Sequence, residues 1–190
     1  MRTDGVLIPE MNPIEIIDRY YSPGALRDLL LAHSGAVAGK ALSIIDRKGL
    51  TGIDRDFVYE AAMLHDIGIF RCDAPDIYCN GSLPYICHGV EGRMILESEG
   101  LPRHALVCEH HTGSGLTTGE IISQNLPLPH RDMLPTTPEE RLICYADKFF
   151  SKSADHPTAE KSLDRVRSSM ARFNPEVLER FEALHAEFGS

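Results

Sequence analysis

The sequence predicts an all-α domain, a helical bundle whose apolar faces share a substantial core. Apolar residues recur at intervals of three and four along most of the 190 residues, which is the spacing of an amphipathic helix. Several of these segments follow a capping residue and a proline, as at Asn12-Pro13 and Thr137-Pro138, and such pairs are typical of helix starts. Strict alternation of apolar and polar residues, which would indicate strands, does not stand out.

The same signals bound each helix in turn. The first three expected helices begin at Asn12-Pro13, run from Ser22-Pro23 to about Lys48 with Gly49 as the stop, and run from Asp54 to about Gly68. The next three run from about Pro84 to Glu99 before Gly100, from Pro102 to His111, and from about Gly119 to Leu126. The last three are one that begins at Thr137-Pro138 and a pair between Thr158 and Phe188 joined at Asn174-Pro175. The turn-rich segments Phe70–Pro84 and Leu126–Pro135 are expected to be loops that frame a pocket.

Two of the expected helices form an amphipathic C-terminal tail. Their polar faces are expected to be solvated, and their apolar stripes contain Leu163, Val166, Met170 and Phe173, followed by Leu178, Phe181 and Leu184.

The bulk composition fits one globular domain over residues 1–190, with a core at about 22–152 and a helical extension at about 157–188. The formal charge of -9 argues against a broad surface for a nucleic acid polymer or an anionic membrane. No apolar run approaches the roughly 20 residues of a membrane span, and Met1 to Glu10 lacks the pattern of a signal peptide. Five cysteines without a C-x-x-C pair favour reduced thiols, so a cytoplasmic location is expected.

The most informative feature is a set of histidines and aspartates on apolar helix faces. A single such residue is more often a satisfied core side chain than a ligand, but several on different helices reverse that preference. The nitrogen and oxygen donors, without thiolate, suit Fe, Mn, Ni or Zn. The candidate metal ligands are His33, His65, Asp66, His88, His110 or His111, and Asp147.

These residues resemble the H…HD…D pattern of the HD-domain metal-dependent phosphohydrolases. His65-Asp66-Ile67-Gly68 is the HDIG form of the motif, and Ala146-Asp147-Lys148 resembles the stretch that closes it. The additional histidines His88 and His110-His111 resemble those of the binuclear branch.

The resemblance implies two divalent metal ions. One would be held by His33, His65, Asp66 and Asp147, and the second by His88 and His111 with Asp66 as the bridge. His110 would be a ligand of an additional metal, a group behind the ligands, or a general acid. Ile69 follows Gly68 where lysine is usual in the cyclic dinucleotide phosphodiesterases, and no Gly-Tyr-Pro follows His111, so that activity is not expected.

The expected function is hydrolysis of a phosphate ester or phosphoanhydride of a small, nucleotide-like substrate by a metal-bridging hydroxide. Asp66 and Lys148 are the expected catalytic residues, and the cations expected to contact phosphate are Lys148, Arg93 and Arg71. An oligomer is compatible with the sequence.

Two other functions share this ligand pattern. By resemblance, HD-type mixed-valence di-iron oxygenases use a similar array, and a non-catalytic metal-binding signalling module would also retain it. Oxygen consumption by an iron-loaded, coloured protein would indicate the oxygenase, whereas colourless turnover of phosphate compounds with Mn or Ni would indicate the hydrolase.

Overall fold

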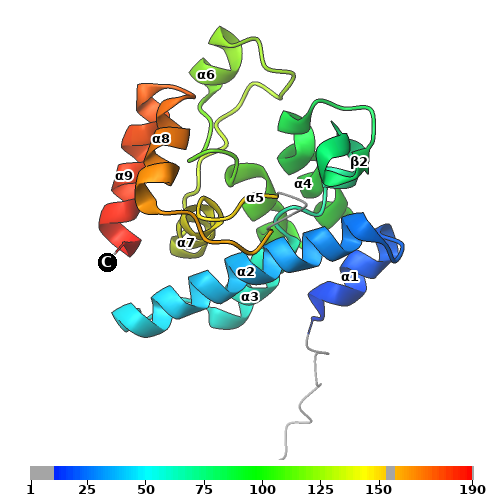
Figure 1. Ribbon diagram of the computed structural model, residues 1–190, viewed down its shortest axis with the longest axis horizontal. Helices are drawn as coiled ribbons and strands as arrows, with labels where there is room; N and C mark the ends of the chain where they lie inside the picture. Colours follow the sequence, from blue (N-terminus) through cyan, green and yellow to red (C-terminus); the bar gives the residue numbers. More distant parts are fainter. Residues whose placement is uncertain (1–10, 153–156, 190) are drawn as a thin grey trace, which may run out of the picture.

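The computed structural model describes residues 11–152 and 157–189, and helices dominate these residues (Figure 1). The α-helices are α1 (Pro13–Tyr20), α2 (Ala25–Lys48), α3 (Arg55–Leu64), α4 (His88–Ser98), α5 (Pro102–His110), α6 (Thr118–Ser123), α7 (Pro138–Asp147), α8 (Leu163–Ala171) and α9 (Pro175–Phe188). The remaining elements are the antiparallel strands β1 (Asp73–Ala74) and β2 (Cys79–Asn80) and the 3₁₀ turns η1 (Ile69–Arg71), η2 (Pro75–Ile77) and η3 (Tyr85–Cys87). The all-α prediction is confirmed.

Four predicted helix starts are confirmed by their capping hydrogen bonds. The side chains of Asn12, Asp54, Thr137 and Asn174 each accept a bond from a backbone N–H in the first turn of the following helix. The predicted start at Ser22-Pro23 is wrong. Gly24, whose φ of 155° and ψ of -179° suit glycine, separates that proline from α2, which therefore begins at Ala25 without a side-chain cap.

The packing places α7 at the centre of the larger core. It contacts α2, α3, α5 and α9, while α4 packs along α5 and α2 along α3. In Figure 1 the long α2 crosses the lower part of the molecule beside α1 and α3, and α8 and α9 lie side by side at one flank. The fully buried Phe181 and Phe188 of α9 pack around Tyr145 of α7, so the C-terminal helices share the core of the domain.

The tail helices differ from the predicted pattern at one position. Val166, Met170, Phe181 and Leu184 are buried, but Phe173 is 62% exposed. The reason is that α8 ends at Ala171, so the helical stripe does not extend to Phe173.

The apolar stripe of α2 faces the core as predicted, with His33 buried among its apolar residues. Among the described helices, α2 is long and apolar enough to cross a membrane by length and composition alone. Half of the most apolar 18-residue stretch of α2 is buried inside the domain, which accounts for its apolar composition. All five cysteines are buried and free.

Candidate metal centre

Six of the predicted ligands come together from five packed segments, each at the end or on the buried face of a helix. His33 projects from the middle of α2, whereas the others lie where helices begin or end. All six side chains are buried, and they are His33, His65, Asp66, His88, His111 and Asp147. Helix ends bring side chains and backbone groups together from several directions, and the turn after α3 supplies two of the six.

Asp66 lies between two groups of histidines. Its Oδ2 atom is 3.3 Å from Nε2 of His33 and 3.2 Å from Nε2 of His65. Its Oδ1 atom is 3.3 Å from Nε2 of His111 and 3.5 Å from Nε2 of His88. One carboxylate therefore contacts both halves of the cluster.

Asp147 completes the first half of the cluster. Its Oδ1 atom is 3.1 Å from Nε2 of His33 and 3.5 Å from Nε2 of His65. In the second half, Nε2 of His88 and Nε2 of His111 are 3.1 Å apart. Asp147 thus belongs to one half, whereas Asp66 belongs to both.

Backbone carbonyls orient three of the imidazole rings. Nδ1 of His65, His88 and His111 lies 2.6, 2.7 and 2.8 Å from the carbonyl oxygen of the residue three positions earlier in each case. A carbonyl only accepts, so each Nδ1 is the protonated nitrogen and donates to it. The lone pair of each Nε2 atom consequently faces the cluster, as metal-binding histidines require.

The donor set fits divalent metal ions. Nε2 of His65 and Oδ1 of Asp66 are buried and form no hydrogen bond with the described residues, which is costly unless a ligand compensates them. The donors form three overlapping groups, and within each group the ligand atoms all lie within 4.8 Å of one another. The groups are His33, His65 and Asp66; His65, His111 and Asp147; and Asp66, His88 and His111. The cluster can therefore hold a metal in either half.

The electrostatics of the cluster favour bound cations. Burial opposes ionisation of Asp66, but the charges of His65 and Lys152 keep its pKa well below the ordinary value. Burial would lower the pKa of His65, but Asp66 and Asp147 raise it to about 9. Burial and the nearby His111 lower the pKa of His88 to about 3, so this ring is neutral, as a ligand must be.

A pocket of about 440 Å³ adjoins Asp147 and carries three lysines, Lys148, Lys152 and Lys161. Nζ of Lys148 lies 2.7 Å from Oδ2 of Asp147 and donates to the carbonyl of His111 at 2.8 Å. The sequence analysis missed Lys152, whose Nζ lies 2.8 Å from Oδ2 of Asp66. Its separation of four residues from Lys148 was the available signal, but α7 ends at Asp147 and no helical periodicity extends to Lys152.

His110, one of the candidate metal ligands, does not join the cluster, whereas the preferred His111 does. Its Nδ1 atom lies 2.7 Å from Oε2 of Glu140, and its Nε2 atom lies 3.6 Å from Glu109. Burial lowers the pKa of His110, but these two carboxylates outweigh it and raise the pKa to about 9. Both ring nitrogens of His110 thus face glutamates outside the cluster, and none of the three donor groups includes this residue.

The two predicted phosphate-binding arginines also lie elsewhere. Arg93 pairs with the buried Glu109 and with Glu97, and Arg71 lies 3.4 Å from Glu91. Neither lines the pocket beside Asp147. Of the two expected loops, Phe70–Pro84 contributes to that pocket through Ala74, Asp76 and Ile77, whereas Leu126–Pro135 is not part of its lining.

Helical architecture and a buried His/Asp cluster define this protein as a bundle built around a candidate metal centre. The model of the HD-domain family matches residues 30–151, and the chain belongs to that family. Membership of this family supports a metal-dependent hydrolase-type fold, and HD domains generally bind divalent metals. This bears out the resemblance expected from the HDIG motif.

Three curated relatives give a more mixed picture. The chain is 32% identical to proteins named tRNA (cytidine(56)-2'-O)-methyltransferase from Picrophilus torridus, over 65% of this chain and 32% of the relative, and from Thermoplasma volcanium, over 71% and 35%. It is 38% identical to an uncharacterised protein of Methanocaldococcus jannaschii over 51% of this chain and 50% of the relative.

The chain thus spans about a third of the length of the two methyltransferases and half of the length of the third relative. No solved structure matches it.

Proposed function

We propose that this protein is a metal-dependent phosphohydrolase that cleaves a phosphate ester or phosphoanhydride of a small, nucleotide-like substrate. The observation that carries the proposal is the position of three lysines in a pocket that includes Asp147 of the His/Asp cluster. Nitrogen and oxygen donors bind divalent metals, and lysines beside them attract a phosphate. Membership of the HD-domain family supports the same class of chemistry.

The residues have distinct tasks in this proposal. His33, His65, Asp66 and Asp147 would hold one metal, and His88 and His111, with Asp66 shared, would hold the other. Bound divalent ions supply Lewis acidity that polarises the phosphoryl group and activates water. The two oxygens of Asp66 face opposite halves of the cluster, so its position fixes both halves relative to each other.

The lysines neutralise charge on the transferring phosphoryl group. Lys148 is held by Asp147 and by the carbonyl of His111, so its ammonium group is fixed at the pocket. In the reaction, the oxygen of water forms a bond to phosphorus while the ester P–O bond breaks. The leaving oxygen retains the electron pair of that bond and receives a proton that originates from water.

Phosphate release in ¹⁸O-labelled water tests the proposal. The chain would be loaded separately with Mn²⁺, Ni²⁺, Fe²⁺ or Zn²⁺ and given p-nitrophenyl phosphate, nucleoside monophosphates and dinucleotides. One ¹⁸O atom is expected in each released phosphate, or in one nucleotide product of a dinucleotide, because water attacks phosphorus. Oxygen consumption by the iron-loaded protein without phosphate release would overturn the proposal in favour of an oxygenase.

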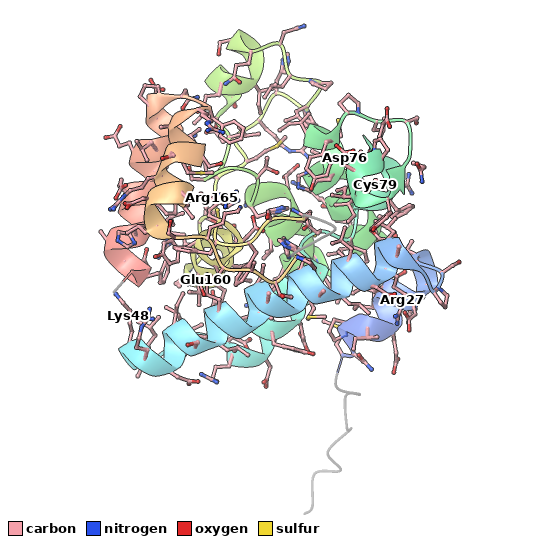
Figure 2. The ribbon with its side chains drawn as sticks, in the orientation of Figure 1. Arg27, Lys48, Asp76, Cys79, Glu160 and Arg165 are labelled. Atoms are coloured by element: carbon pink, nitrogen blue, oxygen red, sulfur yellow. The ribbon has the colours of Figure 1, made fainter. Side chains whose placement is uncertain are left out.

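Two variants assign the residues in this assay. Asp66→Ala should lose both bound metal and turnover, since it removes the carboxylate shared by the two halves. Lys148→Met should keep its metal content but lose about 10²-fold in kcat, the usual effect of removing one group that stabilises transition-state charge. Lys48→Met is the control, because Lys48 stands at the far end of α2 and does not line the pocket (Figure 2). Normal metal content and activity in Asp66→Ala would contradict the assignment.

Two relatives carry a name for methyl transfer to tRNA, and each is about three times as long as the stretch that matches this chain. The HD-domain match covers most of the chain, and the phosphohydrolase proposal is built on the residues within it.

A further inference from the structure

The pocket beside the candidate metal centre is built from three parts of the chain. One wall is the hairpin segment, residues 73–80 with strands β1 and β2, which lines the pocket through Asp76 and Ile77. A second part is the segment that follows α7, residues 148–152. The third wall comes from α8 and the residues on either side of it, through Lys161, Ser169, Met170 and Phe173, none of which lies within the family match at residues 30–151. In Figure 2, Asp76 on the hairpin segment and Arg165 on α8 lie on opposite sides of the central elements.

Positive charge is concentrated where the pocket meets the cluster. Lys148 and Lys152 contact the two cluster carboxylates, Asp147 and Asp66. Lys161 donates from the third wall to the carbonyl oxygens of Phe150, at 2.8 Å, and Lys148, at 3.3 Å. An anionic group such as phosphate is therefore favoured at this end of the pocket.

The third wall also carries apolar residues. Met170 and Phe173 line it, and Ile77 lines the hairpin side. Phe173 is 62% exposed, the highest exposed fraction among the large apolar residues of the described chain. Its exposed ring provides a flat apolar surface at the pocket, and such a surface prefers a planar ligand group.

The neighbouring groove beyond Phe173 does not suit the same ligand. It is lined by Glu120 and Glu176 as well as Arg180, and the guanidinium of Arg180 is already paired with Glu120. An anionic ligand that contacts Phe173 would thus place its charge on the lysine side of the ring.

We propose that Phe173 and Met170 are specificity-determining residues, which select phosphate compounds that carry a planar, apolar group over those with a small aliphatic group. The phosphate end would face the lysines and the cluster, and the planar group would lie against the ring of Phe173. The cavity volume of about 440 Å³ is within the range of small-ligand pockets. The inference deepens the proposed function, since it concerns the same pocket, and it gives α8 and the residues that follow it a role in recognition.

Binding of two non-hydrolysable probes tests the inference apart from turnover. Titration calorimetry would measure the affinity of the Mn²⁺-loaded full chain for phenylphosphonate and for methylphosphonate. The wild type should prefer phenylphosphonate, and Phe173→Ala should reduce that preference about three- to tenfold, as expected for loss of one aromatic contact. Methylphosphonate affinity should stay within about twofold, because the lysines and the cluster are unchanged.

Ile122→Ala is the matched control, because Ile122 of α6 is 55% exposed but does not line the pocket. It should keep the full preference for phenylphosphonate. Equal affinity of the wild type for the two probes, or an unchanged preference in Phe173→Ala, would overturn the inference. A preference that depends on Phe173 in a protein that releases no phosphate would uphold the inference and reject the proposed hydrolysis.

Discussion

Gly68 closes the HDIG motif because another backbone lies against it. A Cβ atom at this position would be 2.3 Å from the carbonyl oxygen of His88 and 2.4 Å from the backbone nitrogen of Gly92. The φ angle of Gly68 is -83°, which any residue can adopt, so space alone requires glycine. Because the obstructing atom belongs to His88, the glycine sets how closely the two halves of the cluster approach.

Gly68→Ala is therefore expected to destabilise the protein by about 1–3 kcal/mol, the usual cost of overpacking a well-packed site. It should also weaken metal binding, since relief of the clash displaces His88. Urea unfolding and competition with a chelator measure the two effects. Gly39→Ala is the control: Gly39 is exposed on α2, has no atom within 4 Å of an added Cβ, and should gain about 0.5–1 kcal/mol. Equal stability of both variants would refute the steric account.

The pair His110-His111 shows where single residues escape prediction from sequence. Neighbouring residues on a helix point about 100° apart, so only one of the two can face the cluster. Which one does depends on the rotation of α5 and on Glu140, a partner 30 positions away. His33, His65 and Asp147 were predictable because they lie on the apolar faces of their own helices.

At the scale of elements, Glu120 connects α6 to α9. Its carboxylate accepts from the guanidinium of Arg180 at 2.8 Å and from the side chain of Asn174, the N-cap of α9, at 2.9 Å. It also completes the capping box of α6 with Thr117. Burial would raise the pKa of Glu120, but these hydrogen bonds lower it to about 2.

The stability contributed by Glu120 should depend on pH. A carboxyl group with a lowered pKa in the folded state stabilises fully above its unfolded pKa, near 4.5, and loses that contribution as the pH falls toward 2. Glu120→Gln should therefore lower the free energy of unfolding at pH 7, and the difference from wild type should shrink by about 1 kcal/mol at pH 3.5. Urea unfolding at both pH values measures it. A difference that is the same at pH 7 and pH 3.5 would contradict the lowered pKa.

Helix boundaries were predictable where a side chain caps the helix and not where backbone geometry decides. Asn12, Asp54, Thr137 and Asn174 carry their own capping oxygen, so the local sequence contains the whole signal. The start of α2 instead follows the positive φ angle of Gly24. No local pattern distinguishes that case from a proline at the first helical position.

At the scale of the whole molecule, the helical class and the shared face of the ligands followed from periodicity, but the shape of the pocket did not. Periodicity shows which side of a helix is buried, and it is silent on which loops from distant parts of the chain meet at one opening. The hairpin segment and the region around α8 are about 100 residues apart in the sequence, and both line the pocket of Asp147. Lys152 and Phe173 take their places in it only through that tertiary arrangement.

The same arrangement predicts that metal stabilises the entire domain. The cluster joins α2, the turn after α3, and the adjoining ends of α4, α5 and α7, and an unfolded chain cannot hold these donors together. Free metal at about 100 times its Kd should add about 2.7 kcal/mol to the free energy of unfolding. For a chain of this size, such a gain corresponds to a rise of about 5–10 °C in Tm. Thermal unfolding with Mn²⁺ and with a chelator measures it.

Two neighbouring histidines make this test specific. His111→Gln removes a donor that faces Asp66, so most of the metal-dependent rise in Tm should disappear. His110→Gln keeps a polar side chain beside Glu140 and removes no donor of the cluster, so the full rise should remain even if its baseline Tm is lower. The comparison separates a general loss of stability from a loss of metal binding, because only the difference between the metal and chelator conditions is compared. Loss of the metal-dependent rise in His110→Gln but not in His111→Gln would assign the ligand to the other residue and reverse the orientation of α5 described by the structure.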